Sequence, residues 1–443
     1  MGRLPRLAYL VTVVALAVAA VAGGARSDSS SSQSTWTTFH FDNARTGYNP
    51  FETILGPGNV QFLTPKWIGM NMGGLVISSS PAVTKTTVFV TDSWFGRLWA
   101  FSKSCGSGGS FCDPAWSGLM AADYGSESSP TVANGFVYAG SNDGGLYVFN
   151  ARGCGSSECD PVWVGQMSAG TLDSSPLIRH GVVYIGTHDN RLYAFDAAGC
   201  GNDTCAPLWV GVGPTGQGFT SPAFANGVVY VSSISSGGKL YAFDANGCGS
   251  STCSPLWKGA PADSSNFVES GPAVANGVVF VGVDHGLAAF AAAGCGRPNC
   301  RPRWTGSQGF DEFAFDTPAV ANGFVYIGVD ATLQVYKTTG CGSKTCSPVW
   351  SGTASGSQAE ILSSPTVANG VVYVGENSMK VLAFDAAGCG DSFCGPLWQG
   401  FTDDSIVSSS PSIVDGVLYI GSGNRFYPDD QAGRVYAFSL DGS

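Results

Sequence analysis

The sequence predicts an all-β protein: an eight-bladed β-propeller of four-stranded antiparallel blades, with an N-terminal strand closing the last blade. Two series of residues recur along the chain with one shared period of 46–50 residues. A repeat of this length that holds four short apolar runs has the size of one propeller blade. The first series consists of prolines that follow a small residue, namely Pro81, Pro130, Pro176, Pro222, Pro272, Pro318, Pro365 and Pro411. The second consists of Trp67, Trp116, Trp163, Trp209, Trp257, Trp304, Trp350 and Trp398.

Each repeat contains four strand-like runs, as the second repeat illustrates. Residues 129–133 and 136–140 flank Asn134-Gly135, a dipeptide that accepts positive φ at both centres of a type I′ hairpin turn. Residues 146–149 form the third run, and a short fourth run carries the tryptophan. Valine, isoleucine and aromatic residues fill these runs, as half-buried strands prefer.

The number of repeats predicts how the ring closes. The eighth repeat starts at Pro411 and reaches Ser443 without a fourth strand, whereas Trp67 has no three strands before it. We therefore expect the strand around Trp67 to complete the last blade and to join the two ends of an eight-bladed ring. A seven-bladed ring would leave one repeat unplaced.

The first 25 residues have the order of a secretory signal peptide. Arg3 and Arg6 precede an apolar run, and small residues follow it up to Ala25. An uncleaved anchor is the alternative, because the run approaches the minimum length for spanning a bilayer. We expect a secreted or extracytoplasmic protein. The predicted parts are a signal peptide (1–25), a Ser-rich linker (26–35), an N-terminal lead-in (36–66) and the propeller (67–443).

The net charge of −11 excludes some partners. Nucleic-acid binding depends on Lys and Arg that neutralise phosphates, and anionic lipid surfaces attract basic segments. We expect no nucleic acid, membrane contact only through an uncleaved anchor, and a monomeric ring.

The fourteen cysteines form seven closely spaced pairs, each in the turn between the third and fourth runs. An exported chain with an even cysteine count favours seven local disulfides, each holding the edge strand to its blade. Metal binding is the alternative, but zinc sites usually combine two such pairs, and here every pair belongs to a different blade. The pairs are Cys105/Cys112, Cys154/Cys159, Cys200/Cys205, Cys248/Cys253, Cys295/Cys300, Cys341/Cys346 and Cys389/Cys394.

Two sets of carboxylates are expected at one face of the ring, where they could hold calcium. This ion takes six to eight oxygen ligands. Ordinary turn chemistry is the alternative and the one we favour, because no calcium-loop spacing is present. The set before the innermost strands is Glu127, Asp173, Glu269 and Asp316. The set between the second and third strands is Asp143, Asp189 and Asp284.

Motifs of known chemistry are few. The segment 211–216 matches the Gly-x-Gly-x-x-Gly fingerprint of dinucleotide binding, but it lies between two predicted strands with no helix to hold a pyrophosphate. We interpret it as a chance match. The histidines, His40, His180, His188 and His285, lie in different units without paired spacing.

The repeats SSPTVANGVVYVGENSMKVLAFDAAGCG and SSPLIRHGVVYIGTHDNRLYAFDAAGCG, each ending on PLW, resemble the pyrroloquinoline-quinone (PQQ)-type propeller repeat from Trp67 to the C-terminus. The resemblance implies that each periodic tryptophan docks between blades. Proteins with this repeat fall into two functional classes. Quinoprotein dehydrogenases use PQQ with calcium and often two adjacent cysteines, whereas assembly-factor-like propellers bind proteins. This chain has no adjacent Cys-Cys pair and no long insertions, so it looks closer to the second class.

We expect a secreted, disulfide-stapled propeller with a ligand-binding or protein-scaffold role at one face and without a cofactor. The alternative is a PQQ- and calcium-dependent alcohol or sugar dehydrogenase, for which the sequence identifies neither catalytic nor cofactor-binding residues. A third possibility is a carbohydrate-binding or hydrolytic propeller. It would use exposed aromatics such as Trp94 and Trp99, which lie off the periodic series.

Overall fold

The structure is a computed structural model in which two compact units are distinguished, Met1–Ser30 and Ser31–Ser443. The second unit is described here. The predicted signal peptide, apart from Gly2, and the Ser-rich linker up to residue 34 lie outside the described residues. Within the described part, no helix is long and apolar enough to cross a membrane. The structure describes residues 2, 35–69, 76–121, 124–171, 173–213, 218–233, 238–260, 270–283, 286–306, 316–353, 356, 359–423 and 433–442.

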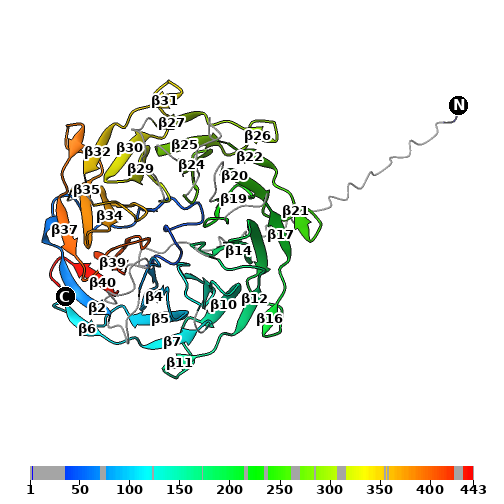
Figure 1. Ribbon diagram of the computed structural model, residues 1–443, viewed down its shortest axis with the longest axis horizontal. Coiled ribbons are helices and arrows are strands. Elements are labelled where there is room, and N and C mark those ends of the chain that lie inside the picture. Colours follow the sequence, from blue (N-terminus) through cyan, green and yellow to red (C-terminus); the bar gives the residue numbers. More distant parts are fainter. Residues whose placement is uncertain are drawn as a thin grey trace. The chain divides into compact units, whose positions relative to one another are not determined.

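Eight β-sheets lie around a common axis within this unit, which confirms the predicted eight-bladed propeller (Figure 1). The innermost strands are β3 (Ala82–Val83), β8 (Thr131–Ala133), β13 (Leu177–Arg179), β18 (Ala223–Ala225), β23 (Ala273–Ala275), β28 (Ala319–Ala321), β33 (Thr366–Ala368) and β38 (Ser412–Val414). The second strands are β4 (Thr87–Thr91), β9 (Phe136–Gly140), β14 (Val182–Thr187), β19 (Val228–Ser232), β24 (Val278–Val283), β29 (Phe324–Val329), β34 (Val371–Glu376) and β39 (Val417–Gly421).

The outer strands continue each blade toward the rim. The third strands are β5 (Arg97–Ser102), β10 (Gly145–Asn150), β15 (Arg191–Asp196), β20 (Leu240–Asp244), β25 (Gly286–Ala291), β30 (Thr332–Lys337), β35 (Lys380–Asp385) and β40 (Val435–Ser439). The fourth strands are β7 (Trp116–Leu119), β12 (Trp163–Gln166), β17 (Trp209–Val212), β22 (Trp257–Gly259), β27 (Trp304–Gly306), β32 (Trp350–Thr353), β37 (Trp398–Phe401) and, in the last blade, β2 (Thr64–Gly69).

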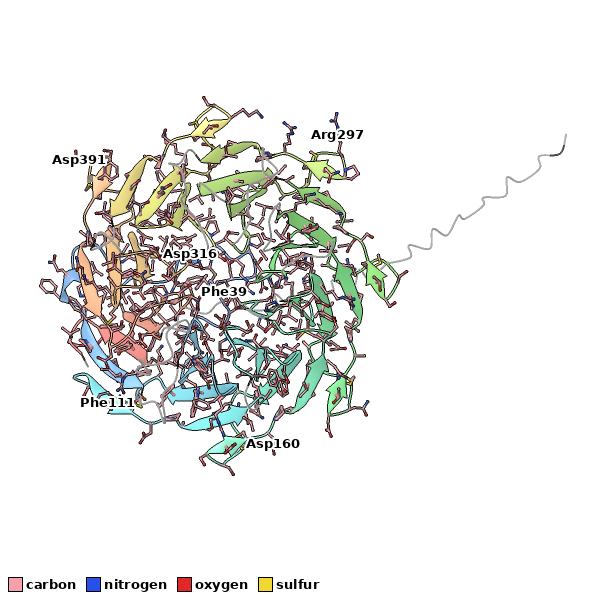
Figure 2. The ribbon with its side chains drawn as sticks, viewed as in Figure 1. Phe39, Phe111, Asp160, Arg297, Asp316 and Asp391 are labelled. Carbon is pink, nitrogen blue, oxygen red and sulfur yellow. A yellow bond between two sulfur atoms is a disulfide. The ribbon has the colours of Figure 1, made fainter. Side chains whose placement is uncertain are left out.

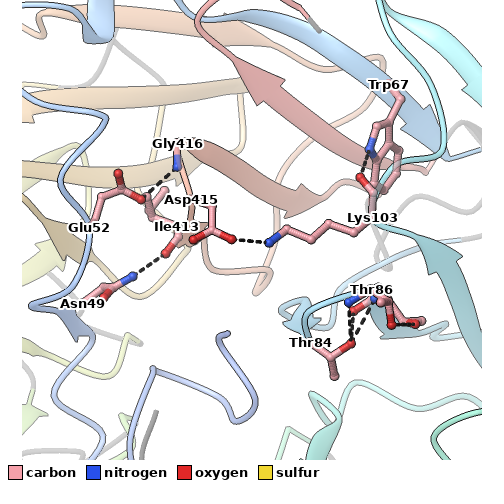
Figure 3. Close-up of polar contacts among 10 residues, drawn as sticks. Asn49, Glu52, Trp67, Thr84, Thr86, Lys103, Ile413, Asp415 and Gly416 are labelled. Atoms are coloured by element: carbon pink, nitrogen blue, oxygen red, sulfur yellow. Dashed lines mark hydrogen bonds and ion pairs between the residues drawn. The ribbon is translucent and has the colours of Figure 1, made fainter. Parts of the chain in front are cut away.

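The ring closes as predicted. Strand β2 pairs antiparallel with β40, so that Trp67 lies opposite Ala437. Further contacts cross the same seam (Figure 3). The Trp67 indole Nε1 donates to the Lys103 carbonyl at 3.3 Å, and the Lys103 ammonium lies 2.7 Å from Asp415 Oδ2. The first and last blades are therefore joined by main-chain and side-chain bonds.

Every sheet has a fifth strand that was not predicted: in the seventh blade it is β1 (Tyr48–Asn49), which pairs in parallel with β33, and in the other seven sheets it comes from a cysteine loop. Each cysteine loop contributes a short strand that pairs in parallel with the fourth strand of the preceding blade, as Cys205 does opposite Gly165. The seven disulfides form as predicted, with Cα–Cα distances of 5.6–5.8 Å. Because each loop pairs with the neighbouring blade, the disulfides stabilise junctions between blades as well as single blades. The fifth strands from the cysteine loops are β6 (Ser110–Cys112), β11 (Glu158–Cys159), β16 (Thr204–Cys205), β21 (Thr252–Cys253), β26 (Asn299–Cys300), β31 (Thr345–Cys346) and β36 (Phe393–Cys394).

The eighth junction replaces the cysteine loop with a turn of 3₁₀ helix. The last blade takes its fourth strand from the N-terminal segment, and there η1 (Val60–Phe62) packs beside β37. Leu63 is buried, as the second cysteine of each loop is, and its carbonyl accepts a hydrogen bond of 3.0 Å from the Trp398 indole. This segment therefore covers an edge that would otherwise be open.

The periodic tryptophans dock between blades, as the resemblance implied. A Cβ added to Gly153 would meet the Trp116 ring at 2.9 Å, and this glycine belongs to the next blade and has a φ of +75°. A residue with a side chain would clash there, and the conformation itself favours glycine. The same packing joins Trp163 to Gly199, Trp209 to Gly247, Trp257 to Gly294, Trp304 to Gly340 and Trp350 to Gly388.

Candidate functional site

Residues 36–49, here called the axial segment, run through the middle of the ring (the dark blue trace in Figure 1). The backbone turns sharply at residues with positive φ, including His40, Phe41 and Arg45. The segment contacts the innermost part of every blade. Main-chain amides of six blades donate to it, those of Val83, Val132, Phe224, Val274, Val320 and Val367, at 2.6–2.8 Å. The third and eighth blades accept side-chain bonds, from Arg45 to Pro176 and from Asn49 to Ile413.

Arg45 is the central residue of the axial segment and is fully buried. Its Nε donates to the Pro222 carbonyl at 2.9 Å, and Nη2 donates to the carbonyls of Ser175 at 3.3 Å and Pro176 at 2.9 Å. Nη1 donates to Thr38 Oγ1 at 2.7 Å and to a carbonyl of the same segment. Burial lowers the Arg45 pKa to about 9, and the nearby Asp42 partly opposes this shift. The guanidinium thus joins the segment to two blades.

Two further groups of the segment, buried His40 and half-buried Asp42, have shifted pKa values. Burial lowers the His40 pKa to about 4, although its ring nitrogens lie 2.7 Å from the Arg45 carbonyl and 2.8 Å from the Pro365 carbonyl. A neutral imidazole donates to one of these two carbonyls. Burial raises the pKa of Asp42, which accepts hydrogen bonds from the Thr46 amide and hydroxyl at 3.0 and 2.7 Å.

Hydroxyl groups form a belt around the axis, one residue before the proline that opens each innermost strand. The Ser80 amide donates to Ser129 Oγ at 2.8 Å, and the Ser129 amide donates to Ser175 Oγ at 3.0 Å. The belt crosses the seam, where Ser410 donates to Ser80. It is interrupted at Gly271, which has no hydroxyl. We call the following residues the hydroxyl belt: Ser80, Ser129, Ser175, Ser221, Thr317, Ser364 and Ser410.

Asp316 breaks a second repeated pattern, one residue earlier in the chain. In the other seven blades, a hydroxyl at this position accepts the amide of the residue twelve positions later, at 2.5–3.1 Å. Asp316 is 5% exposed, and its Oδ2 has no hydrogen-bond partner among the described residues. Burial raises its pKa well above the usual value. A buried carboxyl group with a raised pKa therefore lies near the axis (Figure 2).

The other predicted carboxylates lie in two sets of loops, one before the innermost strands and one between the second and third strands. Glu127 and Asp173 are half-buried, three residues before Pro130 and Pro176, whereas Glu269 lies outside the described residues. Burial raises the Asp173 pKa to about 6, and the charge of His188 partly opposes this shift. Asp143 accepts from the Gly145 amide and the Tyr147 hydroxyl and so stabilises its own loop. Asp189 accepts from Thr187 in its own loop and from Ser168 in the segment that connects blades two and three. Asp284 lies outside the described residues.

The residues that the structure describes hold no cluster of side chains typical of a metal site. No group of three or more His, Cys, Asp or Glu side chains comes together among them. The cation on the axis, Arg45, already donates to carbonyl and hydroxyl oxygens. All fourteen cysteines are bonded within their own loops, which Figure 2 places at the rim through the labelled Phe111, Asp160, Arg297 and Asp391. The calcium site remains a prediction that involves loops outside the described residues.

Exposed aromatic side chains gather in the loops of the first blade. Trp94, Phe95 and Tyr124 are 42%, 46% and 54% exposed. Their two loops touch, since a Cβ on Gly96 would meet the Tyr124 carbonyl at 2.4 Å. Buried Asp92 holds the first loop by accepting from the amides of Trp94 and Phe95 and from the Trp99 indole. Trp99 is thus a buried part of the support, while the other aromatics form an exposed patch, the blade-1 aromatic patch.

Sequence reasoning missed the axial segment and the hydroxyl belt as site-forming features. The belt is visible as a Ser-Pro or Thr-Pro pair at seven of the eight periodic prolines. Nothing in the sequence, however, marks which residue of 36–49 faces which blade, because the segment has no period of its own.

The fold and the repeats define a PQQ-like propeller repeat protein. More specifically, the chain belongs to the family described as outer membrane protein assembly factor BamB, whose model matches residues 202–441, more than half of the chain. No curated protein sequence is detectably similar to it.

Solved structures with the same fold come from both functional classes. BamB from Moraxella catarrhalis is 14% identical with a TM-score of 0.56, covering 85% of this chain and 97% of its own. Quinohemoprotein alcohol dehydrogenase from Comamonas testosteroni is 14% identical with a TM-score of 0.64, covering 92% and 81%. The computationally designed Ika8 protein is 12% identical with a TM-score of 0.60, covering 84% and 99%. At this level of identity the likeness concerns the fold alone.

Proposed function

We propose that this protein is an exported, non-catalytic propeller that binds a protein partner and acts as a scaffold. The observation that carries the proposal is the axial segment, which hydrogen-bonds to all eight blades and takes up the middle of the ring. The guanidinium of Arg45, the cation on the axis, donates its hydrogen bonds to carbonyl and hydroxyl oxygens of the protein itself. Among the described residues, no three or more His, Cys, Asp or Glu side chains come together as they would in a metal site, which supports this proposal.

Export is supported by the seven disulfides and by the N-terminal sequence. Disulfides persist in oxidising compartments and are rare in the cytosol. The matching family is described as outer membrane protein assembly factor BamB, and one of the similar solved structures is BamB from Moraxella catarrhalis. Placement of this chain outside the cytoplasm is consistent with that name.

The partner is expected to bind at the blade-1 aromatic patch. Tryptophan, tyrosine and phenylalanine are enriched where proteins bind one another, because they bury large areas at low entropic cost. The Asp92 hydrogen bonds fix the loop that carries Trp94 and Phe95, so little ordering remains to be done on binding.

Reconstitution tests the non-catalytic part of the proposal. Purified protein is incubated with PQQ and calcium, and uptake is followed by absorbance and by a dye-linked alcohol or sugar dehydrogenase assay. We expect neither stoichiometric uptake nor turnover. Tight uptake with turnover would establish the dehydrogenase alternative and overturn the scaffold role.

Affinity capture from the extracytoplasmic fraction tests the binding part. Full-length protein and a Trp94→Ser/Phe95→Ser variant are compared by quantitative mass spectrometry. A Phe393→Ser variant is the matched control, because Phe393 is 66% exposed but lies on the rim strand β36. We expect one protein to be lost from the patch variant and kept by the control. Equal capture by all three, or capture of oligosaccharide alone, contradicts the assignment.

A further inference from the structure

Blade three departs from the other repeats at the turn between its first and second strands. Most repeats have Ala-Asn at the third and fourth positions after the periodic proline, whereas this blade has Arg179-His180. The His180 backbone keeps the positive φ of the other turns, +51°. The substitution therefore changes the side chains at this place and leaves the turn itself intact.

Blade four departs at the residue that faces this turn. Its second position after the proline is Phe224, where the other seven repeats have valine or isoleucine. The rings of His180 and Phe224 meet edge to face, with centroids 5.9 Å apart and an interplanar angle of 89°. The Arg179 guanidinium lies over the Phe224 ring, 5.7 Å from its centroid. Three independent departures from the repeat thus form one cluster across a blade junction.

His180 and Phe224 of this cluster line a cavity of about 740 Å³ between blades three and four, and Arg179 lies over the Phe224 ring. The floor of the cavity includes Trp209, a member of the periodic series, and Tyr184, whose hydroxyl donates to the Ala245 carbonyl at 2.8 Å. The same tyrosine bond occurs in the second, fourth and sixth blades. The exposed side chain of Leu208 and the loop of residues 246–251 complete the lining. In a repeat protein, positions that depart from the shared pattern without a structural reason are candidates for function. The volume lies within the range of small-molecule sites.

The chemistry of the cavity favours one class of ligand. Among the described residues no Asp, Glu or Lys lines the cavity, whereas His180 lines it and the guanidinium of Arg179 lies over the Phe224 ring. The nearest acid along the chain, Asp244, is already engaged, since its Oδ1 accepts from the amide and side chain of Asn246 at 2.9 and 3.2 Å. Phe224 offers an aromatic ring, and Asn246, Ser250 and Ser251 offer polar atoms.

We propose that the cavity between blades three and four binds a small ring compound that carries a carboxylate. The ring stacks on Phe224 and His180, and the carboxylate lies beside Arg179 and His180. A uronic-acid sugar and an aromatic acid share this chemistry. The site lies on the face of the strand 1–2 turns, opposite the blade-1 aromatic patch, so it does not depend on the proposed scaffold function.

Isothermal titration of the full-length protein with four probes tests the site. Digalacturonate and phenylacetate are the acids, and a neutral galactose disaccharide and phenylacetamide are their uncharged counterparts. We expect at least one acid to bind with a Kd below about 1 mM and its neutral counterpart to bind at least about tenfold more weakly. Whichever acid binds more tightly identifies the source of the ligand.

Two variants restore the residues of the other repeats and should therefore fold. His180→Asn and Phe224→Val are each expected to weaken binding of the acid about tenfold, with circular dichroism unchanged. The control is Asn134→His, which places an imidazole in the equivalent turn of blade two, opposite Ile178 instead of a phenylalanine. It should leave affinity unchanged. The proposal is overturned if neither acid binds at about 10 mM. It is also overturned if the neutral probes bind as tightly as the acids, or if both restoring variants keep the affinity of the wild type.

Discussion

The amide of Ser410 in the last blade donates to Oγ of Ser80 in the first, with 2.8 Å between the two atoms. This bond continues the hydroxyl belt across the only junction where the chain has to return to its beginning. The same amide-to-hydroxyl hydrogen bond therefore joins the blades at the seam and the blades that are neighbours in the chain. Each of these bonds can be removed by a single substitution.

Replacing Ser80 by alanine is expected to destabilise the protein by about 1–3 kcal/mol, because the buried Ser410 amide would lose its acceptor. Urea unfolding followed by tryptophan fluorescence measures the change. Ser104→Ala serves as the control, since this serine is exposed. A Ser80→Ala protein as stable as the control would show that water replaces the hydroxyl at no cost.

Replacing Arg45 by methionine should cost about 3–5 kcal/mol, because several buried carbonyl oxygens lose a charged donor at once. Arg45→Lys is expected to recover only part of this loss, since one ammonium cannot reach the carbonyls of Pro222 and Pro176 together. Thermal and urea unfolding of both variants provide the measurement. A methionine variant within about 1 kcal/mol of the wild type would mean that the axial segment contributes little to stability.

Asp316 should make stability fall as pH rises. Its pKa in the folded protein is raised above the unfolded value, so the folded state binds the proton more tightly. The resulting stabilisation is fully present below the unfolded pKa and is lost as pH rises toward and through the folded pKa. Asp316→Ser, which restores the hydroxyl of the other blades, should remove this dependence.

The measurement is the difference in unfolding free energy between Asp316→Ser and the wild type at several pH values from acid to neutral. We expect the serine variant to gain relative stability as pH rises. Asp42, Asp92 and Asp173 also have raised pKa values, but they are common to both proteins and cancel in the difference. A difference independent of pH would show that Asp316 titrates normally.

Removing one disulfide should affect two blades. In the Cys248→Ser/Cys253→Ser variant we expect a loss of roughly 2 kcal/mol. Hydrogen exchange should accelerate at the Val210 amide, which belongs to the preceding blade and donates to the Ser251 carbonyl at 2.9 Å. Strand β37, whose edge η1 covers, provides an internal reference. Faster exchange confined to the fourth blade would contradict the shared role of the loop.

The number of blades could be predicted from the sequence because the repeat recurs with a regular spacing. The spacing of Pro81 and its equivalents, and the early position of Trp67, predicted the eight blades and the closing strand β2. The fifth strands could not be predicted in the same way. Residues such as Thr204 and Cys205 pair with a different blade, and parallel pairing between repeats leaves no local pattern.

The candidate site was less accessible to prediction, since it depends on departures from the repeat. Asp316 was noted as a carboxylate, but its raised pKa follows from burial, which a sequence does not give. Arg45 lies in a segment without periodicity, and its partners Pro176 and Pro222 are more than a hundred residues away.

The axial segment also sets the order in which the molecule can be completed. Trp36 to Asn49 leave the ribosome before any blade exists, yet their partners extend as far as Ile413 in the last blade. The N-terminal axial segment therefore cannot make all of its hydrogen bonds until the last, C-terminal blade has been synthesised.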